Sequence, residues 1–487
     1  MPLEIEDKFD VPADYALPDL KGIPGCAEVS RTLSHQLVAI YFDTPDLRLA
    51  ARGVTLRRRR GGDDAGWHLK LPKAKGARQE IQLPLTRSAK VVPPELAQLV
   101  LAYTRGAALA PVAQLETRRG LTRLLDDEGA VLAEIADDRV KGTVFGDDPL
   151  VRRWREVEAE LKEGDRDLLK RVAKRLRKSG ATPAEASSKL GRLLGEIPAP
   201  HRSEPRTTPK PGSAGEVVVS YLRAQVAALN AQDPRVRQAE EDAVHQARVA
   251  CRRLRSALKA FKRIVTGTEE LQEELRWLGE VLGEARDLEV IRERFTERLD
   301  ALDPSLVVGS VRRRLGDDLL AKEHDAYDRI RETLSGERYF ALLDALDALV
   351  ACPPLTEYAA KDADKALARI VGKGWQRVVE RYDAARAIEE LDRRETAMHD
   401  VRKAAKRARY TAEAVGMREQ AMRAETVQEV LGRHQDGVVA QGLLLEEAEV
   451  ARQAGEDTFT YGVLAGLEHA AAVRAHEEFP EVWARVS

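Results

Sequence analysis

The chain has 487 residues, 43% of them hydrophobic, and is long enough for two or three domains with substantial cores. Its 79 basic and 81 acidic residues give a formal net charge of −2, so affinity for a polyanion would have to come from local clusters of charge. Three widely spaced cysteines argue against a disulfide framework or a zinc site, and no stretch approaches the ~18 apolar residues of a membrane span. The N-terminus lacks the apolar segment of a signal peptide, and we expect a cytoplasmic protein with no membrane partner.

The first third of the chain contains short segments in which charged and apolar side chains alternate, the pattern of β-strands with one charged face. They cover residues 3–11, 41–53 (a strand, a turn and a short edge strand), 54–60, 67–72, 77–85, 114–125, 130–140 and 154–161. Any one of them alone is best explained as an ordinary antiparallel strand with its polar face in water. Several segments present Arg or Lys, however, and others present paired Glu. This favours a barrel with its charged faces inward, around phosphates and a metal ion.

Seven motifs follow one another along these segments and the helical stretch after them. They are LEIEDK, TLRRRR, HLKLP, RQEIQ, AEIADDRV, VEAELKEG and SSKLG. The first alone, an ExExK triplet, is common by chance, but the ordered series is specific. It resembles the CYTH domain of the triphosphate tunnel metalloenzymes over about residues 1–197. The resemblance implies an eight-stranded antiparallel β-barrel whose tunnel binds a triphosphate together with a divalent metal ion.

The resemblance also implies roles for individual residues. Glu4, Glu6 and Lys8 would form the catalytic triplet. The expected metal ligands are Glu4, Glu6, Asp138, Glu158 and Glu160. The expected triphosphate-binding cations are Lys8, Arg57, Arg59, Lys70, Arg78, Arg119, Arg123 and Lys189. Carboxylate ligands suit Mg²⁺ or Mn²⁺. Glu80 and Glu134 would complete the acidic set.

Three of these assignments depend on strand phase or stay open. Strand phase favours Asp138 over Asp137, because Asp138 then shares a face with Glu134. The neighbours Arg118 and Arg119 are ambiguous in the same way, and the role of Glu156 is open.

The composition of the chain changes after the last predicted strand. Residues 162–195 have helical patterning, which would bring Lys189 to the sheet. Residues 198–212 contain five prolines and no periodicity, and we interpret them as a linker between domains at 1–197 and 213–487. The second domain is patterned as helix throughout, with at least eight helices.

Residues 245–261 and 399–415 repeat one amphipathic helix design 154 residues apart. The basic stripe of the first copy consists of His245, Arg248, Arg252, Arg255 and Lys259. The stripe of the second copy consists of His399, Arg402, Lys406 and Arg409, with Glu413 where Lys259 would recur. A second echo pairs LGEARDLEV at 282–290 with LGRHQDGVV at 431–439. We therefore expect two related halves, at about 213–350 and 351–487.

A basic stripe on a single helix is usually a solvated face, but core packing gives no reason to duplicate one. Two stripes that face each other would form a single positive channel, made uneven by Glu413. The motifs resemble the CHAD domain, the conserved histidine α-helical domain, over about residues 213–487. That resemblance implies a pair of four-helix bundles that bind inorganic polyphosphate. The whole fold would then be α+β and multidomain.

Three functions are compatible with this sequence. The first is a polyphosphate-associated enzyme that hydrolyses a triphosphate in its tunnel, with an expected association with polyphosphate granules. The second is a polyphosphate-binding or targeting protein without turnover. The third is a nucleic-acid-binding protein, which the 5% aromatic content disfavours because few side chains can stack on bases. The identity of the triphosphate and the oligomeric state stay open at this stage.

Overall fold

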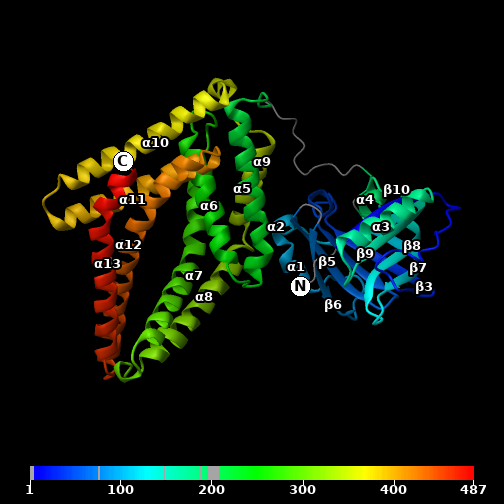
Figure 1. The fold of residues 1–487 in the computed structure, drawn as a ribbon, viewed down its shortest axis with the longest axis horizontal. Coiled ribbons are helices and arrows are strands. Elements are labelled where there is room, and N and C mark those ends of the chain that lie inside the picture. Colours follow the sequence, from blue (N-terminus) through cyan, green and yellow to red (C-terminus); the bar gives the residue numbers. More distant parts are fainter. Residues whose placement is uncertain (1–4, 75–76, 147–148, 187, 196–207, 487) are drawn as a thin grey trace. The chain divides into compact units, whose positions relative to one another are not determined.

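The computed structural model describes residues 5–74, 77–146, 149–186, 188–195 and 208–486 (Figure 1). The chain divides into two compact units, Met1–Arg202 and Ser203–Ser487. The division falls inside the predicted linker, most of which lies outside the described residues. No described helix is both long enough and apolar enough to cross a membrane.

The first unit is built on one antiparallel sheet with the order β10-β1-β9-β8-β7-β3-β4-β5-β6, and β2 pairs with β7. Its strands are β1 (Ile5–Val11), β2 (Glu28–Val29), β3 (Leu33–Asp43), β4 (Thr55–Arg60), β5 (Gly66–Ala74), β6 (Ala77–Leu83), β7 (Ala110–Leu125), β8 (Val131–Val144), β9 (Leu150–Leu161) and β10 (Thr182–Pro183). The sheet thus has ten strands where eight were predicted. Among the described residues its two ends do not pair, so closure into a barrel is not confirmed.

In the segment 41–53, the predicted strand and turn are present, but the short edge strand predicted after the turn is wrong. Strand β3 ends at Asp43, whose carboxylate accepts hydrogen bonds from the backbone N–H groups of Thr44 at 2.7 Å, Leu49 at 2.9 Å and Ala50 at 2.9 Å. A side chain that caps backbone groups on both sides of a turn takes them away from a strand ladder. The chain therefore turns after Asp43 and forms a short 3-10 helix, Ala50–Arg52, where the short edge strand was expected.

Short helices cover parts of the sheet. They are α1 (Pro94–Leu99), α2 (Leu101–Thr104), α3 (Arg166–Lys178) and α4 (Lys189–Leu194). Ser188 is the N-cap of helix α4. Its hydroxyl accepts a hydrogen bond from the Gly191 N–H at 3.0 Å. Leu190 and Leu193 of this helix are buried in a cluster with residues of β3, β7 and β8. This packing fixes the helix against the sheet and with it the position of Lys189, its first residue.

The second unit is helical, as predicted. Its helices are α5 (Ala214–Arg237), α6 (Ala243–Ala260), α7 (Glu269–Ala301), α8 (Leu319–Thr333), α9 (Glu337–Ala351), α10 (Ala363–Arg386), α11 (Leu391–Ala414), α12 (Arg418–Gln453) and α13 (Phe459–Val486). In the part of the chain that the structure describes, five of these helices lie in the predicted first half and four in the second. A pair of four-helix bundles is therefore not confirmed.

Two long helix pairs, α7 with α8 and α12 with α13, extend side by side and meet at their far ends (Figure 1). A buried apolar cluster joins them there, with Phe295 and Leu315 from one side and Leu444 and Tyr461 from the other. Packing at this end holds the two halves together and leaves the opposite end, with α6, α10 and α11, as a separate region.

Candidate functional site

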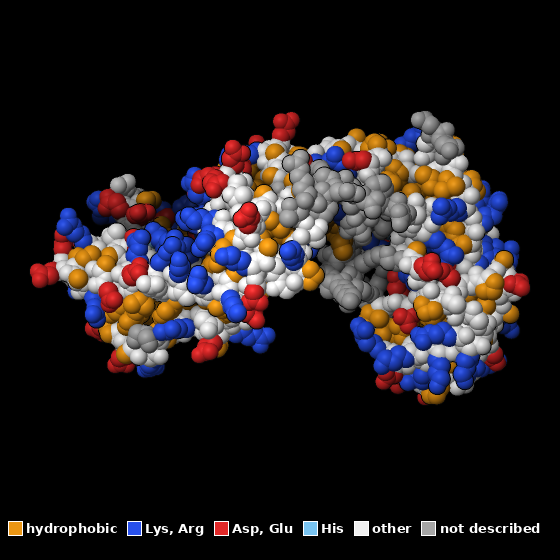
Figure 2. Space-filling model, turned by 90° about the horizontal axis from the view of Figure 1, so that it is seen from above, with side chains coloured by type: hydrophobic (Ala, Val, Ile, Leu, Met, Phe, Trp, Pro, Cys, Tyr) orange, Lys and Arg blue, Asp and Glu red, His pale blue; other side chains and the backbone are white. Residues whose placement is uncertain are grey.

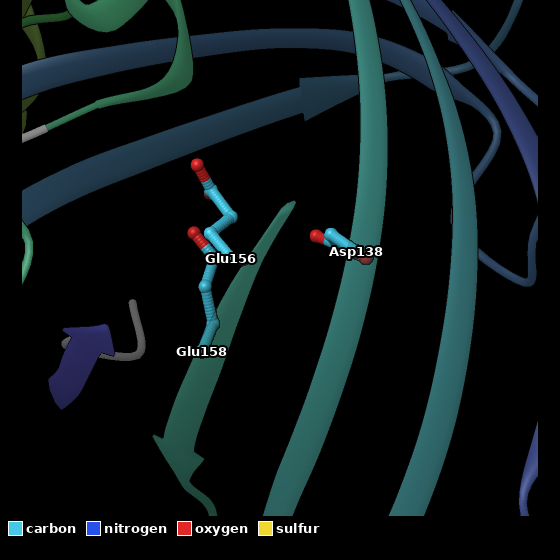
Figure 3. Close-up of side chains that lie close together, drawn as sticks. All are labelled: Asp138, Glu156 and Glu158. Carbon is cyan, nitrogen blue, oxygen red and sulfur yellow. The ribbon is translucent and has the colours of Figure 1, made fainter. Parts of the chain in front are cut away.

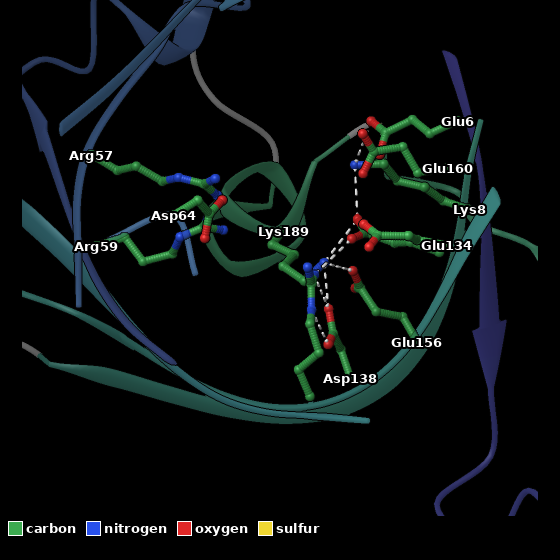
Figure 4. A network of polar contacts seen from close by, with 12 residues as sticks. Glu6, Lys8, Arg57, Arg59, Asp64, Glu134, Asp138, Glu156, Glu160 and Lys189 are labelled. Atoms are coloured by element: carbon green, nitrogen blue, oxygen red, sulfur yellow. Dashed lines mark hydrogen bonds and ion pairs between the residues drawn. The ribbon is translucent and has the colours of Figure 1, made fainter. Parts of the chain in front are cut away.

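A charged cavity of about 120 Å³ lies within the curved sheet of the first unit (Figure 4). The charged side chains that line it are Glu6, Lys8, Arg57, Arg59, Asp64, Lys70, Glu80, Arg119, Glu158, Glu160 and Lys189. Arg57 and Arg59 of β4 extend from one side, and Glu6 and Glu160 face them from β1 and β9. The cavity thus has a cationic wall and an acidic wall.

Strand register produces the acidic wall. Glu6 of β1 lies opposite Glu160 of β9, which lies opposite Glu134 of β8. Two residues further along, Lys8 lies opposite Glu158. Because residues two apart on a strand share a face, these side chains all point to the same side of the sheet.

Lys189 lies at the centre of the buried part of this wall (Figure 4). Its Nζ is 3.0 Å from Asp138 Oδ2, 2.7 Å from Glu156 Oε1 and 2.8 Å from Glu158 Oε1. Burial alone would lower the pKa of Lys189, but the three carboxylates outweigh it and raise the pKa. Burial would likewise raise the pKa of Glu158, yet Lys189 and the neighbouring Lys8 and Arg119 hold it well below its usual value. Lys189 and Glu158 are therefore both charged at neutral pH.

Two more cations complete this network. Arg119 donates to both carboxylate oxygens of Asp138, at 2.8 and 2.6 Å, and to Glu158 at 3.0 Å. Lys8 lies 3.1 Å from Glu6 and 3.0 Å from Glu158. Asp138 itself is fully buried. Burial would raise its pKa, but Lys189 and Arg119 lower it.

Strand phase separates the neighbours that were ambiguous in the sequence. Arg119 faces the cavity, whereas Arg118 lines a different hollow outside it. Asp138 lies beneath the cavity, and Asp137 pairs instead with Arg155 at 2.7 Å.

The cationic wall contains buried hydrogen-bond donors that have no acceptor among the described residues. The Nε atoms of Arg57 and Arg59 are buried and have no hydrogen-bond partner among the described residues. Burial, together with Arg57 and Arg119, lowers the pKa of Arg59 to about 9, which still leaves it charged at neutral pH. Buried donors without acceptors are costly, so this wall is suited to an anion with several oxygen atoms.

Some predicted residues lie elsewhere. Glu4 is outside the described residues, and so is the side chain of Arg78. Arg123 does not line the cavity, since it pairs with Glu134 at 2.9 Å and reaches Asp63 at 3.7 Å. The sequence prediction missed one charged residue among the described residues that line the cavity, Asp64, which contacts Arg59 from the turn between β4 and β5. Only the acidic pair in the turn sequence GGDDAG could have indicated it.

The acidic wall fits a divalent metal ion. Carboxylate oxygens of Asp138, Glu156 and Glu158 lie within 4.8 Å of one another (Figure 3). All are hard oxygen donors, the type that Mg²⁺ and Mn²⁺ prefer. In the present arrangement the ammonium group of Lys189 is the cation they hold. The three carboxylates are therefore arranged so that they can surround a cation.

In the second unit, helices α6 and α11 pack together and bring the basic stripes close to each other. Burial and the neighbouring Arg252, Arg402 and Arg248 lower the pKa of Lys406 to about 7. Two of these three arginines lie on α6, so the stripes face each other at this point. The Nε atoms of Arg252 and Arg402 are buried without an acceptor among the described residues.

The second echo of the repeat has a structural role. Arg248 lies over Gly283 of α7, where a Cβ atom would come within 3.3 Å of the guanidinium group, and it pairs with Asp287 at 2.6 Å. Arg402 lies in the same way over Gly432 of α12, and 3.8 Å from Asp436. The repeated Gly and Asp thus seat one arginine of each stripe.

The stripes differ toward their ends. Arg409 pairs with Glu413 at 2.7 Å and with Glu425 at 2.8 Å. Lys259 lines a separate cavity. Arg255 borders a groove beside α7. The expected channel is therefore richest in positive charge in the middle.

The two histidines of the stripes are half-buried. His399 Nδ1 lies 3.0 Å from the side-chain oxygen of Gln435. Burial and nearby cations lower the pKa of both His245 and His399. Neither histidine is therefore a strong source of charge at neutral pH.

Comparisons with known proteins agree with this architecture. The family model of the CYTH domain matches residues 2–192, and that of the CHAD domain matches residues 220–445. The uncharacterized protein Rv2226 of Mycobacterium tuberculosis is 40% identical over 98% of this chain and 94% of its own.

Two solved structures are also similar. PptA from Streptomyces chartreusis has 22% identity and a TM-score of 0.48 over 56% of this chain and 99% of its own. The CHAD domain from the plant Ricinus communis has 26% identity and a TM-score of 0.46 over 59% of this chain and 96% of its own. With a relative that matches nearly end to end, the chain belongs to the family of proteins in which a CYTH domain is followed by a CHAD domain.

Proposed function

We propose that the first unit hydrolyses a triphosphate with the help of Mg²⁺ or Mn²⁺, and that the second unit binds inorganic polyphosphate. The observation that carries the first part is the pairing of two walls in one cavity. Arg57 and Arg59 present buried donors without acceptors, and Glu6, Glu158 and Glu160 face them. A triphosphate with a bound cation complements both walls at once.

Each wall has its own task in this proposal. Arg57, Arg59 and Lys70 bind phosphate oxygens and offset the cost of removing the triphosphate from water. Glu6, Glu158, Glu160 and Asp138 would hold the metal ion, with Glu4 as a further predicted ligand. The ion, when bound, supplies charge withdrawal from the phosphate oxygens. A carboxylate that does not hold the ion can orient the water for in-line attack.

Lys8, Arg119 and Lys189 would join both tasks. They now neutralise the acidic wall, and all three side chains also line the cavity. If these carboxylates held a metal ion, Lys8, Arg119 and Lys189 would be available to contact phosphate oxygens. Such an exchange would keep the charge of the buried site nearly balanced.

Polyphosphate binding by the second unit is supported by the middle of the facing stripes. Arg252 and Arg402 have buried donors without acceptors among the described residues, and burial together with these cationic neighbours lowers the pKa of Lys406 to about 7. A linear polyanion would supply acceptors to both helices and relieve this repulsion.

One observation favours the alternative in which the tunnel binds but does not turn over. The cations Lys189, Arg119 and Lys8 already form ion pairs with Asp138, Glu156 and Glu158. A cavity neutralised in this way could hold a triphosphate without a metal ion. The phosphate-release assay of the next paragraph distinguishes hydrolysis of the triphosphate from binding without turnover.

Phosphate release from inorganic triphosphate tests the proposal. With Mg²⁺ or Mn²⁺ present, the double variant Glu6→Gln, Glu160→Gln should lose roughly 100-fold or more of the rate, because it removes two proposed metal ligands. The exposed Glu163, just past β9, offers the control Glu163→Gln, which should keep the full rate. A double variant as fast as the parent would contradict the proposal. A parent that binds triphosphate without releasing phosphate would favour the alternative.

A further inference from the structure

A second cavity in the helical unit, of about 240 Å³, lies where the end of α6 meets α10 and α11. Eight of its lining side chains are Lys or Arg, and none of the described residues that line it is Asp or Glu. Small and apolar side chains, among them Ala404, Ala408 and Ile370, make up much of the remaining lining. We call this cavity the α10 cleft.

Helix α10 contributes a straight row of four cations to the cleft. They are Arg369, Lys373, Arg377 and Arg381, spaced four residues apart. At 1.5 Å per residue the row extends for about 18 Å along the helix. Arg381 pairs with Asp400 at 3.0 Å, whereas the other three have no carboxylate partner among the described residues. Like charges at this spacing repel each other, so the row is unfavourable for the helix itself.

The fold does not require this row. Helix α5 precedes α6 as α10 precedes α11, yet between Val218 and Leu229 its only basic residue is Arg223. The duplicated stripes are thus shared by both halves, while the cations of α10 belong to one half only. A feature that costs stability and is not part of the repeat calls for an explanation from binding.

The cleft is continuous with the facing stripes. Lys259 of the α6 stripe lines it, and Arg407 of α11 lines it directly after Lys406 in the chain. Burial and the neighbours Arg381 and Arg377 lower the pKa of Arg407, and Arg255 of the α6 stripe adds to this effect. Positive charge therefore runs from the stripes into the cleft without an intervening acidic group among the described lining residues. Figure 2 shows a group of Lys and Arg side chains on the surface of the helical unit.

We propose that the α10 cleft is a second binding segment for long-chain polyphosphate. A chain held between the stripes of α6 and α11 continues past the end of α6 and along α10. The row on α10 suits a linear polyanion, since its cations lie in line. The domain would then bind long chains more tightly than short ones. This inference rests on the proposed polyphosphate binding by the stripes.

Binding of size-fractionated polyphosphate to the full chain tests this inference. In the variant Lys373→Ala, Arg377→Ala, affinity for long chains should fall about tenfold at low salt, and the slope of log affinity against log salt should flatten by roughly 1.4, or about 0.7 for each lost contact. Affinity for short chains, which the stripes alone can hold, should stay unchanged. The exposed pair Lys174 and Lys178 on α3 has the same spacing, so Lys174→Ala, Lys178→Ala is the matched control.

The stripe variant Arg252→Ala, Arg402→Ala should weaken binding of long and short chains alike. If the α10 variant binds long chains as the parent does, the cleft is a solvated face and the inference is wrong. An equal loss for long and short chains would also overturn it, because the cleft would then belong to one common site. If the parent chain binds neither fraction, the proposed function itself fails. Thermal unfolding of each variant checks that the fold is retained.

Discussion

At the scale of single residues, Lys189 links the charges of the cavity in the first unit. Its ammonium group contacts three carboxylates that would otherwise repel one another in a buried site. Oxygens of the same carboxylates lie within 4.8 Å of one another. A lysine in this place keeps these carboxylates close together, and a divalent ion bound there would have to displace its ammonium group.

Lys406 provides a pH-dependent test at the same scale. Its pKa in the folded protein is about 7, below the value of about 10.4 expected in the unfolded chain. The unfolded state therefore holds this proton over the window from pH 7 to 10.4, and the free energy of unfolding should rise with pH across that window. A bound polyanion favours the charged amine and raises its pKa.

Polyphosphate should consequently bind roughly tenfold more tightly at pH 6 than at pH 8, with proton uptake near pH 8. Calorimetry at pH 8 in two buffers of different ionisation enthalpy measures the uptake. Lys406→Arg, which stays charged, should remove this part of the pH dependence. Equal proton uptake by parent and variant would assign it to other groups, such as His245 and His399.

At the scale of elements, strand register creates the charged cavity of the first unit, and helix pairing creates the basic surface for which we propose polyphosphate binding. Register aligns Glu6 with Glu160 and Glu134 across three strands. On the helices, an arginine of each stripe lies over a glycine of the next helix, Gly283 or Gly432. Both arrangements follow from backbone geometry, and each is sensitive to a change of one residue.

Gly283→Val tests the helical arrangement. A β-branched side chain there would displace Arg248 from Asp287 and reduce polyphosphate affinity severalfold, with a salt slope smaller by about 0.7. Gly442→Val in α12 is the control, because a Cβ atom there meets no described atom within 4 Å. Both changes carry a similar helix-propensity effect. Equal losses of polyphosphate affinity in the two variants would show that the position of Arg248 over Gly283 does not matter for binding.

The sequence predicted these elements in part. Alternation alone is enough to place Glu6, Lys8, Glu158 and Glu160 on one face, and strand phase selects Asp138 over Asp137. Asp64 was missed because a turn residue has no periodicity to reveal which way it points. The pairing of Arg409 with Glu425 depends on contacts between helices that are not local in the chain. The same is true of the α10 cleft, whose cations come from α6, the turn after it, α10 and α11.

At the scale of the whole molecule, two units that each suit phosphates share one chain. We predict that limited proteolysis cuts between 198 and 212, where five prolines disfavour regular structure, and releases two stable fragments. Mass spectrometry of the fragments locates the cut. Preferential cleavage elsewhere, with this segment resistant, would contradict the domain boundary.

The central claim is that the two units bind different phosphate polymers, and calorimetric titration of the full chain tests it most directly. Arg57→Ala, Arg59→Ala should lose about 100-fold or more in affinity for inorganic triphosphate and keep its affinity for long-chain polyphosphate. Arg252→Ala, Arg402→Ala should do the reverse, and the parent should bind single-stranded nucleic acid more weakly than polyphosphate. Unchanged triphosphate affinity in the first variant, or unchanged polyphosphate affinity in the second, would contradict the account.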